Sequence, residues 1–131
     1  MPKSFANVLG RIALFIIYAW FGILKLIGKS PASELIKALH HKVIPGIPFH
    51  QFFIAFALFE VIIGILFLFP KFAKIAYALF AVHITMAILP LFLLPSFTWQ
   101  SFLIPTIEGQ YIIKNIALIS VVVFLSSQRR Y

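Results

Sequence analysis

The sequence predicts an all-α integral membrane protein. We expect a four-helix bundle with a short amphipathic interfacial helix in its first outer loop, forming one domain over residues 1–131. Of these residues 63% are hydrophobic, only 11% are charged, and the mean hydropathy is +1.07. An ordinary soluble domain is about half apolar and about a quarter charged, and a small one cannot bury this much apolar surface. Each of four apolar stretches is near the ~20 residues with which a helix crosses a bilayer. The predicted spans cover residues 5–27, 49–69, 72–94 and 109–127.

The first predicted span, residues 5–27, carries a polar stripe. Arg11, Tyr18 and Lys25 follow one another at intervals of seven residues, and a heptad step returns an α-helix to nearly the same face. Cations on one face of a membrane helix are costly unless something faces them. We therefore expect this stripe to point toward polar groups on other helices.

Residues 31–43, in the first connection, are predicted to form the interfacial helix. Ser30 suits the helix cap and Pro31 suits the first helical position. One side of this helix is apolar, whereas its lysine and histidines fall largely elsewhere, as is typical of a helix lying at a membrane surface. The apolar side is formed by Leu35, Ile36, Leu39 and Val43.

The second span, residues 49–69, is apolar except for Glu60 near its middle. Ala57 and Gly64 lie one turn before and one turn after Glu60 on the same face. Small residues at these positions allow a neighbouring helix to approach closely.

The third span, residues 72–94, has His83 near its middle, and Pro90 is expected to kink its outer part. The connection that follows, residues 95–108, mixes aromatic residues, prolines and polar residues. We expect it to lie in the headgroup zone rather than to cross the membrane.

The fourth span, residues 109–127, opens with polar residues and then runs apolar. Glu108, just before it, lies seven residues from Asn115 and shares a face with it. Lys114 lies roughly two turns inside the span.

Basic residues predict which side of the membrane each end occupies. The two chain ends and the loop after the second span hold no acid, whereas the other two connections mix lysines with two glutamates. Since basic residues are enriched on the cytoplasmic side, both termini are expected on the cytoplasmic side of the membrane, with the two longer connections outside. The basic residues in the first group are Lys3, Arg11, Lys71, Lys74, Arg129 and Arg130.

Depth along the helices predicts which polar residues meet. With a rise of 1.5 Å per residue, Glu60 and His83 both lie near the midplane, and Arg11 lies about one turn deeper toward the inner side. A lone carboxylate at that depth requires a base or a proton, so His83 and Arg11 are its candidate partners. Lys25 reaches Glu60 only if its long side chain points inward. At the outer rim, Lys25 with Glu108 is the simplest pair.

Two interpretations of these polar residues stay open. Interhelical polar contacts can simply hold a bundle together, each contributing about 1 kcal/mol. Alternatively, they line a small pocket, open toward the outer side, in which a glutamate and a histidine exchange protons with a redox-active molecule such as a quinol. The candidate pocket residues are Arg11, Tyr18, Lys25, Glu60, His83, Glu108, Lys114 and Asn115.

Several functions are disfavoured by composition. The chain has no cysteine, which removes thiolate chemistry and cysteine metal sites from it. No acid or cysteine completes a metal set with His40, His41 and His50, so no metal site is expected. The net charge of +8 comes mostly from residues at the span ends, which favours contact with lipid headgroups and not with nucleic acid. No catalytic motif is present, so we expect at most a membrane subunit of an oxidoreductase.

Four short segments resemble the DoxX-like family of small four-helix bacterial membrane proteins. They are Arg11 early in the first span, Trp20-Phe21-Gly22-Ile23-Leu24-Lys25-Leu26, Phe59-Glu60-Val61-Ile62-Ile63-Gly64-Ile65-Leu66 and Glu108-Gly109-Gln110-Tyr111-Ile112-Ile113-Lys114-Asn115. The family takes its name from a membrane subunit of a thiosulfate:quinone oxidoreductase, and related members are linked to redox assemblies. The resemblance implies that Arg11, Lys25, Glu60, Lys114 and Asn115 form the polar set of the bundle core. Because the chain lacks cysteine, a partner would have to handle any sulfur substrate.

The leading hypothesis is a small subunit that binds a quinone-like lipophilic molecule or anchors a redox partner. No covalently bound cofactor is expected; the candidate cofactor is a quinone, and the expected partners are membrane lipid and either a redox protein or further copies of this chain. A structural or assembly subunit without chemistry of its own is the first alternative. A small-solute permease is the second, and it would have to be an oligomer because four short helices enclose little pore.

Overall fold

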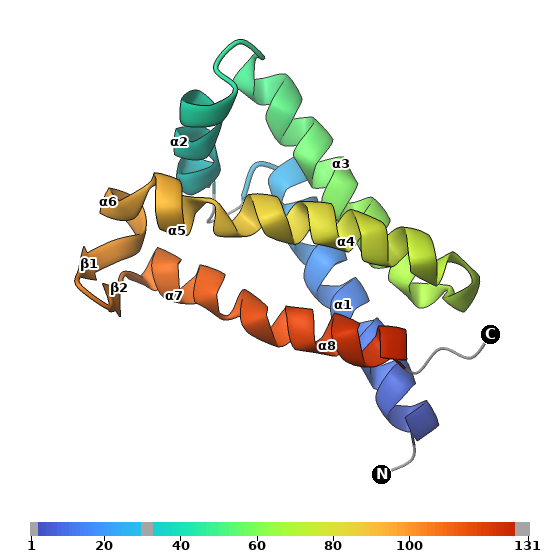
Figure 1. The fold of residues 1–131 in the computed structure, drawn as a ribbon. Helices are drawn as coiled ribbons and strands as arrows, with labels where there is room; N and C mark the ends of the chain where they lie inside the picture. Colours follow the sequence, from blue (N-terminus) through green and yellow to red (C-terminus); the bar gives the residue numbers. More distant parts are fainter. Residues whose placement is uncertain (1–2, 30–32, 128–131) are drawn as a thin grey trace.

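A computed structural model describes residues 3–29 and 33–127 and is drawn in Figure 1. Its longer helices are α1 (Lys3–Leu26), α3 (Phe49–Leu68), α4 (Ala73–Ile88) and α8 (Asn115–Ser127). The shorter elements are α2 (Ser33–Val43), the 3-10 helix η1 (Pro70–Phe72), α5 (Pro90–Leu93), α6 (Pro95–Thr98), β1 (Trp99–Ser101), β2 (Ile104–Pro105) and α7 (Ile107–Ile113). The structure is therefore a helical bundle, as predicted, with one small β-hairpin that was not predicted.

Four helical segments are long and apolar enough to cross a membrane: Phe5–Leu26, Phe49–Leu68, Pro70–Leu93 and Ile107–Ser127. They coincide with the four predicted spans to within a few residues. Their length and composition indicate a multi-pass membrane protein.

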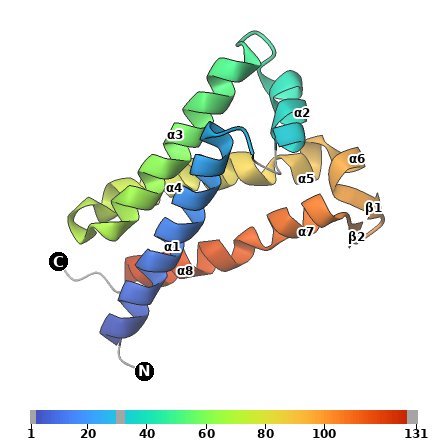
Figure 2. The ribbon, with the colours of Figure 1, turned by 180° about the vertical axis from the view of Figure 1, so that it is seen from behind.

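The molecule has two unlike ends (Figures 1 and 2). One end, which we call the η1 end, carries η1 together with the first turns of α1 and the last turns of α8. The opposite end, which we call the α2 end, carries α2, α5, α6 and the β-hairpin. From the η1 end, α3 and α4 diverge, and α2 contacts both α3 and α5 on the far side.

The closest helix pair is α1 with α3, and glycines make the contact possible. A Cβ atom added at Gly22 of α1 would lie 2.6 Å from Val61 Cγ2 and 2.8 Å from the carbonyl oxygen of Ala57. A Cβ atom added at Gly64 of α3 would lie 3.0 Å from the backbone nitrogen of Ala19. The predicted close approach at Ala57 and Gly64 is therefore confirmed, and α1 is the neighbouring helix.

Toward the η1 end the helices enclose an apolar core. Leu14, Ile63, Phe67 and Leu125 from α1, α3 and α8 are almost entirely buried, and Phe80 of α4 packs with them. Side chains from all four long helices thus meet in this core, which fixes the positions of α1, α3 and α4 before they separate.

Two of the predicted spans are interrupted near the α2 end. The kink predicted at Pro90 is confirmed, since α4 ends at Ile88 and α5 begins at Pro90, which has no N–H to continue the helical ladder. The fourth predicted span, residues 109–127, corresponds to two helices and not to one. That span begins at Ile107 and is divided at Lys114 into α7 and α8.

The connection between the third and fourth spans is ordered by its own hydrogen bonds. The Thr98 hydroxyl donates to the carbonyl oxygens of Pro90 and Leu94, and the Thr106 hydroxyl donates to the carbonyl of Phe97. Thr106 also caps α7 by accepting from the Gly109 N–H at 3.0 Å. These bonds hold α6, the β-hairpin and the start of α7 as one unit.

The short helix predicted in the first connection is confirmed as α2 from Ser33 onward. Ser30 and Pro31, the predicted cap and first position, lie outside the described residues, as do Arg129 and Arg130. Leu35 of the predicted apolar side is buried, whereas Val43 is exposed. His40 is also buried, between the rings of Phe49 and Phe52, so α2 rests on the first turn of α3.

Candidate functional site

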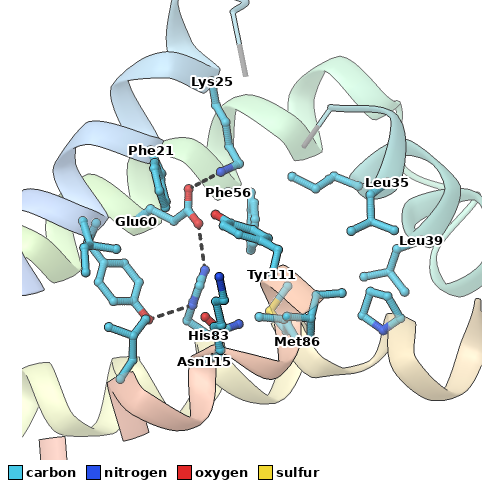
Figure 3. A pocket seen from close by; sticks show the side chains of 18 of the residues that line it. Phe21, Lys25, Leu35, Leu39, Phe56, Glu60, His83, Met86, Tyr111 and Asn115 are labelled. Atoms are coloured by element: carbon cyan, nitrogen blue, oxygen red, sulfur yellow. Dashed lines mark hydrogen bonds and ion pairs between the residues drawn. The ribbon is translucent and has the colours of Figure 1, made fainter. Parts of the chain in front are cut away.

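Glu60 stands at the centre of a polar line that joins three helices. Its carboxylate is buried, with the residue 5% exposed. One carboxylate oxygen, Oε1, accepts from Lys25 Nζ of α1 at 2.7 Å, and the other, Oε2, lies 2.8 Å from His83 Nε2 of α4. Figure 3 shows both contacts as dashed lines. The predicted partnership of Glu60 with His83 is therefore confirmed.

Tyr18 extends this line by one residue. Its hydroxyl lies 2.9 Å from His83 Nδ1, and its ring packs edge-on against His83 and Phe80. A carboxylate only accepts hydrogen bonds, so His83 Nε2 must donate to Glu60. Nδ1 of the neutral imidazole then accepts the Tyr18 hydroxyl proton. The tautomer of His83 is thus set by its two neighbours.

The line carries one ion pair in a low-dielectric setting. Lys25 and Glu60 are each 5% exposed, and the Lys25 ammonium also lies 5.7 Å from the centre of the Phe56 ring. Each charge compensates the other, which is the condition under which buried charges are tolerated in a bundle. His83 and Tyr18 add hydrogen-bonding groups without adding net charge.

A cavity of about 350 Å³ lies beside this line, on the side toward the α2 end. Its walls are largely apolar and come from α1, α2, α3, α4, α5, α7 and α8. The ring of Phe56 stacks on His83 with centres 5.3 Å apart, and Phe52 stacks in turn on Phe56. The apolar lining residues are Ile17, Phe21, Leu35, Ile36, Leu39, Phe52, Phe56, Met86, Ala87, Pro90, Ile112, Ala117 and Leu118.

Six of the eight predicted pocket residues line this cavity. They are Tyr18, Lys25, Glu60, His83, Lys114 and Asn115. The side chains of the first four form the hydrogen-bonded line, while Lys114 and Asn115 come from the junction of α7 and α8. Four of the polar groups therefore form a continuous line along the wall of an apolar space.

Arg11 does not belong to this site. It is half-buried toward the η1 end and does not line the cavity. Arg11 lies seven residues before Tyr18, or about 10 Å along the axis, and the apolar core around Leu14 begins between them. The prediction that Arg11 is a candidate partner of Glu60 is therefore wrong.

Glu108 is also outside the site, and the predicted pair of Lys25 with Glu108 is wrong. Glu108 is exposed in the first turn of α7 and does not line the cavity. The Lys25 side chain points inward to Glu60 and not outward to the rim. A buried carboxylate gains far more from an ammonium than an exposed one does, because water screens the exposed pair.

Tyr111 and Phe56 are two of the cavity residues that the sequence-based prediction missed. Tyr111 was not among the predicted pocket residues, yet Figure 3 shows its side chain reaching into the cavity with the hydroxyl turned toward Glu60. Phe56 was not singled out at all. Both follow helical spacing, since Tyr111 precedes Asn115 by four residues and Phe56 precedes Glu60 by four.

No set of three histidine, cysteine or acidic side chains that could hold a metal ion occurs in residues 3–29 and 33–127. The chain matches no protein-family model, and neither a curated protein nor a solved structure gave a significant match. The site must therefore be interpreted from its own geometry.

Proposed function

We propose that this chain is a DoxX-like subunit of the bacterial inner membrane that binds a quinone-like lipophilic molecule in the cavity beside Glu60. The observation that carries the proposal is the position of the line Tyr18–His83–Glu60–Lys25 along one side of an otherwise apolar space. Ligand sites for apolar molecules combine such walls with a few converging polar groups. Aromatic rings at Phe56, Phe52 and Phe21 offer flat surfaces for a planar ring.

The polar line suits proton exchange with a ligand oxygen. Reducing a quinone to a quinol adds two electrons and two protons. His83 bridges a hydroxyl and a carboxylate, so it can relay a proton between Tyr18 and Glu60, and Glu60 is the member of the line that would exchange the proton with the ligand. The chain has no cysteine for dithiol redox chemistry, so a redox partner protein would supply the electrons.

The proposed orientation places both termini in the cytoplasm and the α2 end outside. Lys71 and Lys74 are exposed in η1 and the first turn of α4, at the same end as the start of α1 and the end of α8. Basic residues favour the cytoplasmic side. The cavity would then face the outer half of the membrane.

A purely structural role is the second candidate, and the complete pairing of Glu60 favours it. Both carboxylate oxygens have a partner, so the line can serve as an interhelical clamp that needs no ligand. In that case the cavity would be filled by lipid chains, and the chain would serve as an assembly subunit.

Extraction of bound lipids from the purified protein separates these two functions. We expect a stoichiometric quinone after purification in mild detergent, and its loss in Glu60→Gln, which keeps the shape of the side chain and removes its charge. The matched control is Glu34→Gln, because Glu34 is an exposed acid on α2 outside the cavity lining. If the wild type holds no quinone and Glu60→Gln merely lowers the melting temperature, the structural role is supported instead.

A further inference from the structure

The cavity lining has more hydrogen-bond donors than acceptors. Lys25 Nζ carries three protons and uses one on Glu60 Oε1. Lys114, an exposed residue that lines the cavity at the junction of α7 and α8, brings three more, and among the described residues it has no acidic partner. Tyr111 adds a hydroxyl turned into the same space (Figure 3). A ligand that satisfies these groups must itself accept hydrogen bonds.

The charged acceptor of the lining is already engaged. Glu60 is the only acid that lines the cavity, and both of its oxygens have partners. The other two acids of the chain, Glu34 and Glu108, are exposed and lie outside the lining. With His83 neutral, Lys25 and Lys114 against Glu60 leave one formal positive charge in excess.

The helix that covers the cavity has a basic outer face. Leu35, Ile36 and Leu39 of α2 line the cavity, while Lys37 and Lys42 on the same helix are exposed. Glu34 is the single acid of α2, so the helix keeps a positive excess. Positive groups around an apolar site raise the local concentration of anions and speed their association.

We propose that the ligand of this cavity is a lipophilic anion, with an oxyanion facing Lys25 and Lys114 and an apolar body among the phenylalanines. Two chemical classes share this property: an alkyl carboxylate and a quinone with an acidic ring hydroxyl. The proposal rests on the proposed function, because it uses the same cavity, and it narrows the ligand from any quinone-like molecule to an anionic one.

Binding of paired probes to the purified wild-type protein tests the charge. Laurate is compared with dodecanol, and the hydroxynaphthoquinone lapachol with its methyl ether, by native mass spectrometry and thermal stabilisation in one detergent. We expect at least one anion to bind about tenfold more tightly than its neutral partner, since a hydrogen bond to a charged group is worth about that factor. The pair that shows the difference identifies the class. Equal binding within both pairs overturns the proposal.

Lys114→Gln tests the position of the anion. We expect it to remove most of the preference for the anion while leaving the neutral probes unchanged. Lys74→Gln is the matched control, because Lys74 is exposed on α4 and does not line the cavity. Equal loss in the two variants also overturns the proposal. If neutral quinones bind and depend on Glu60 while anions have no advantage, the proposed function stands and this inference falls.

Discussion

The two ends of the bundle are held together in different ways. At the η1 end, apolar side chains from four helices close completely around Leu14, Ile63 and Phe67. At the α2 end, the helices are interrupted at Leu89 and Lys114, and a cavity of about 350 Å³ remains between them. The glycine contacts of α1 with α3 lie between these regions and join them.

This difference separates a fully packed region from a region with a cavity along one helix axis. At the well-packed end, van der Waals attraction between side chains stabilises the fold and fixes the positions of the helices. The open end can then keep buried charges and an unfilled volume, both of which oppose folding. The comparison predicts that changes near the glycine contact unfold the protein, whereas changes in the polar line mainly alter binding.

The largest effect is expected for Gly22→Leu. The new side chain would collide with Val61 and with the backbone of Ala57, so α1 and α3 would have to separate. We expect a loss of about 3 kcal/mol in the free energy of unfolding, at the upper end of the range for overpacked cores. Unfolding in mixed micelles with increasing sodium dodecyl sulfate measures it.

The control for this change is Gly46→Leu. A Cβ atom at Gly46 meets no atom within 4 Å, so its stability should stay within about 0.5 kcal/mol of the wild type. Equal losses in both variants would mean that α1 and α3 do not depend on close approach.

A smaller effect is expected for Glu60→Leu. The substitution leaves Lys25 without its carboxylate and His83 Nε2 without an acceptor, at a cost of about 2 kcal/mol. Lys25 lies in the last turn of α1, so its side chain can turn outward and recover part of its hydration. The same unfolding measurement applies.

The double variant Lys25→Met/Glu60→Leu sharpens this result. It removes both charges and replaces them with apolar groups, which is often neutral or stabilising for buried pairs. We expect it to be more stable than Glu60→Leu alone and to bind no quinone. A double variant as unstable as the single one would assign the ion pair a structural role.

The parts of the fold that the sequence predicted well are those set by helix length and depth. Apolar length defined the four spans, because a membrane helix must be long enough to cross the bilayer. Equal depth brought Glu60 and His83 together, since both sit near the middle of their helices. These properties belong to the backbone and need no knowledge of side-chain direction.

The errors in predicting the site arise where the direction of a side chain decides which groups meet. Depth was counted from the backbone of Lys25, but its long side chain places the ammonium at the level of Glu60. Arg11 shares the heptad stripe, yet the apolar core lies between it and the polar line. A spacing pattern shows which face of a helix a residue occupies. It does not show in which direction along the helix axis a long side chain points.

The β-hairpin could not be predicted for a different reason. Its strands contain three and two residues, too few for an alternating pattern. Its tight turn holds Leu103 at φ 61°, a conformation that usually calls for glycine or asparagine. The hydrogen bonds of Thr98 and Thr106 to distant carbonyls stabilise it, and these contacts exist only in the folded chain.

The smallest effect is expected for Tyr18→Phe, which lies where the two regions meet. The phenyl ring keeps the edge-on contact with Phe80 but loses the hydrogen bond to His83 Nδ1. We expect a cost of about 1 kcal/mol, measured as a coupling energy in a double-mutant cycle with His83→Asn. Nitrogen NMR of the His83 ring gives a second readout, because without the tyrosine proton Nδ1 no longer has a donor that favours the Nε2–H tautomer. A coupling near zero with an unchanged tautomer would show that Glu60 alone orients His83, and the polar line would then end at His83 instead of reaching the packed core.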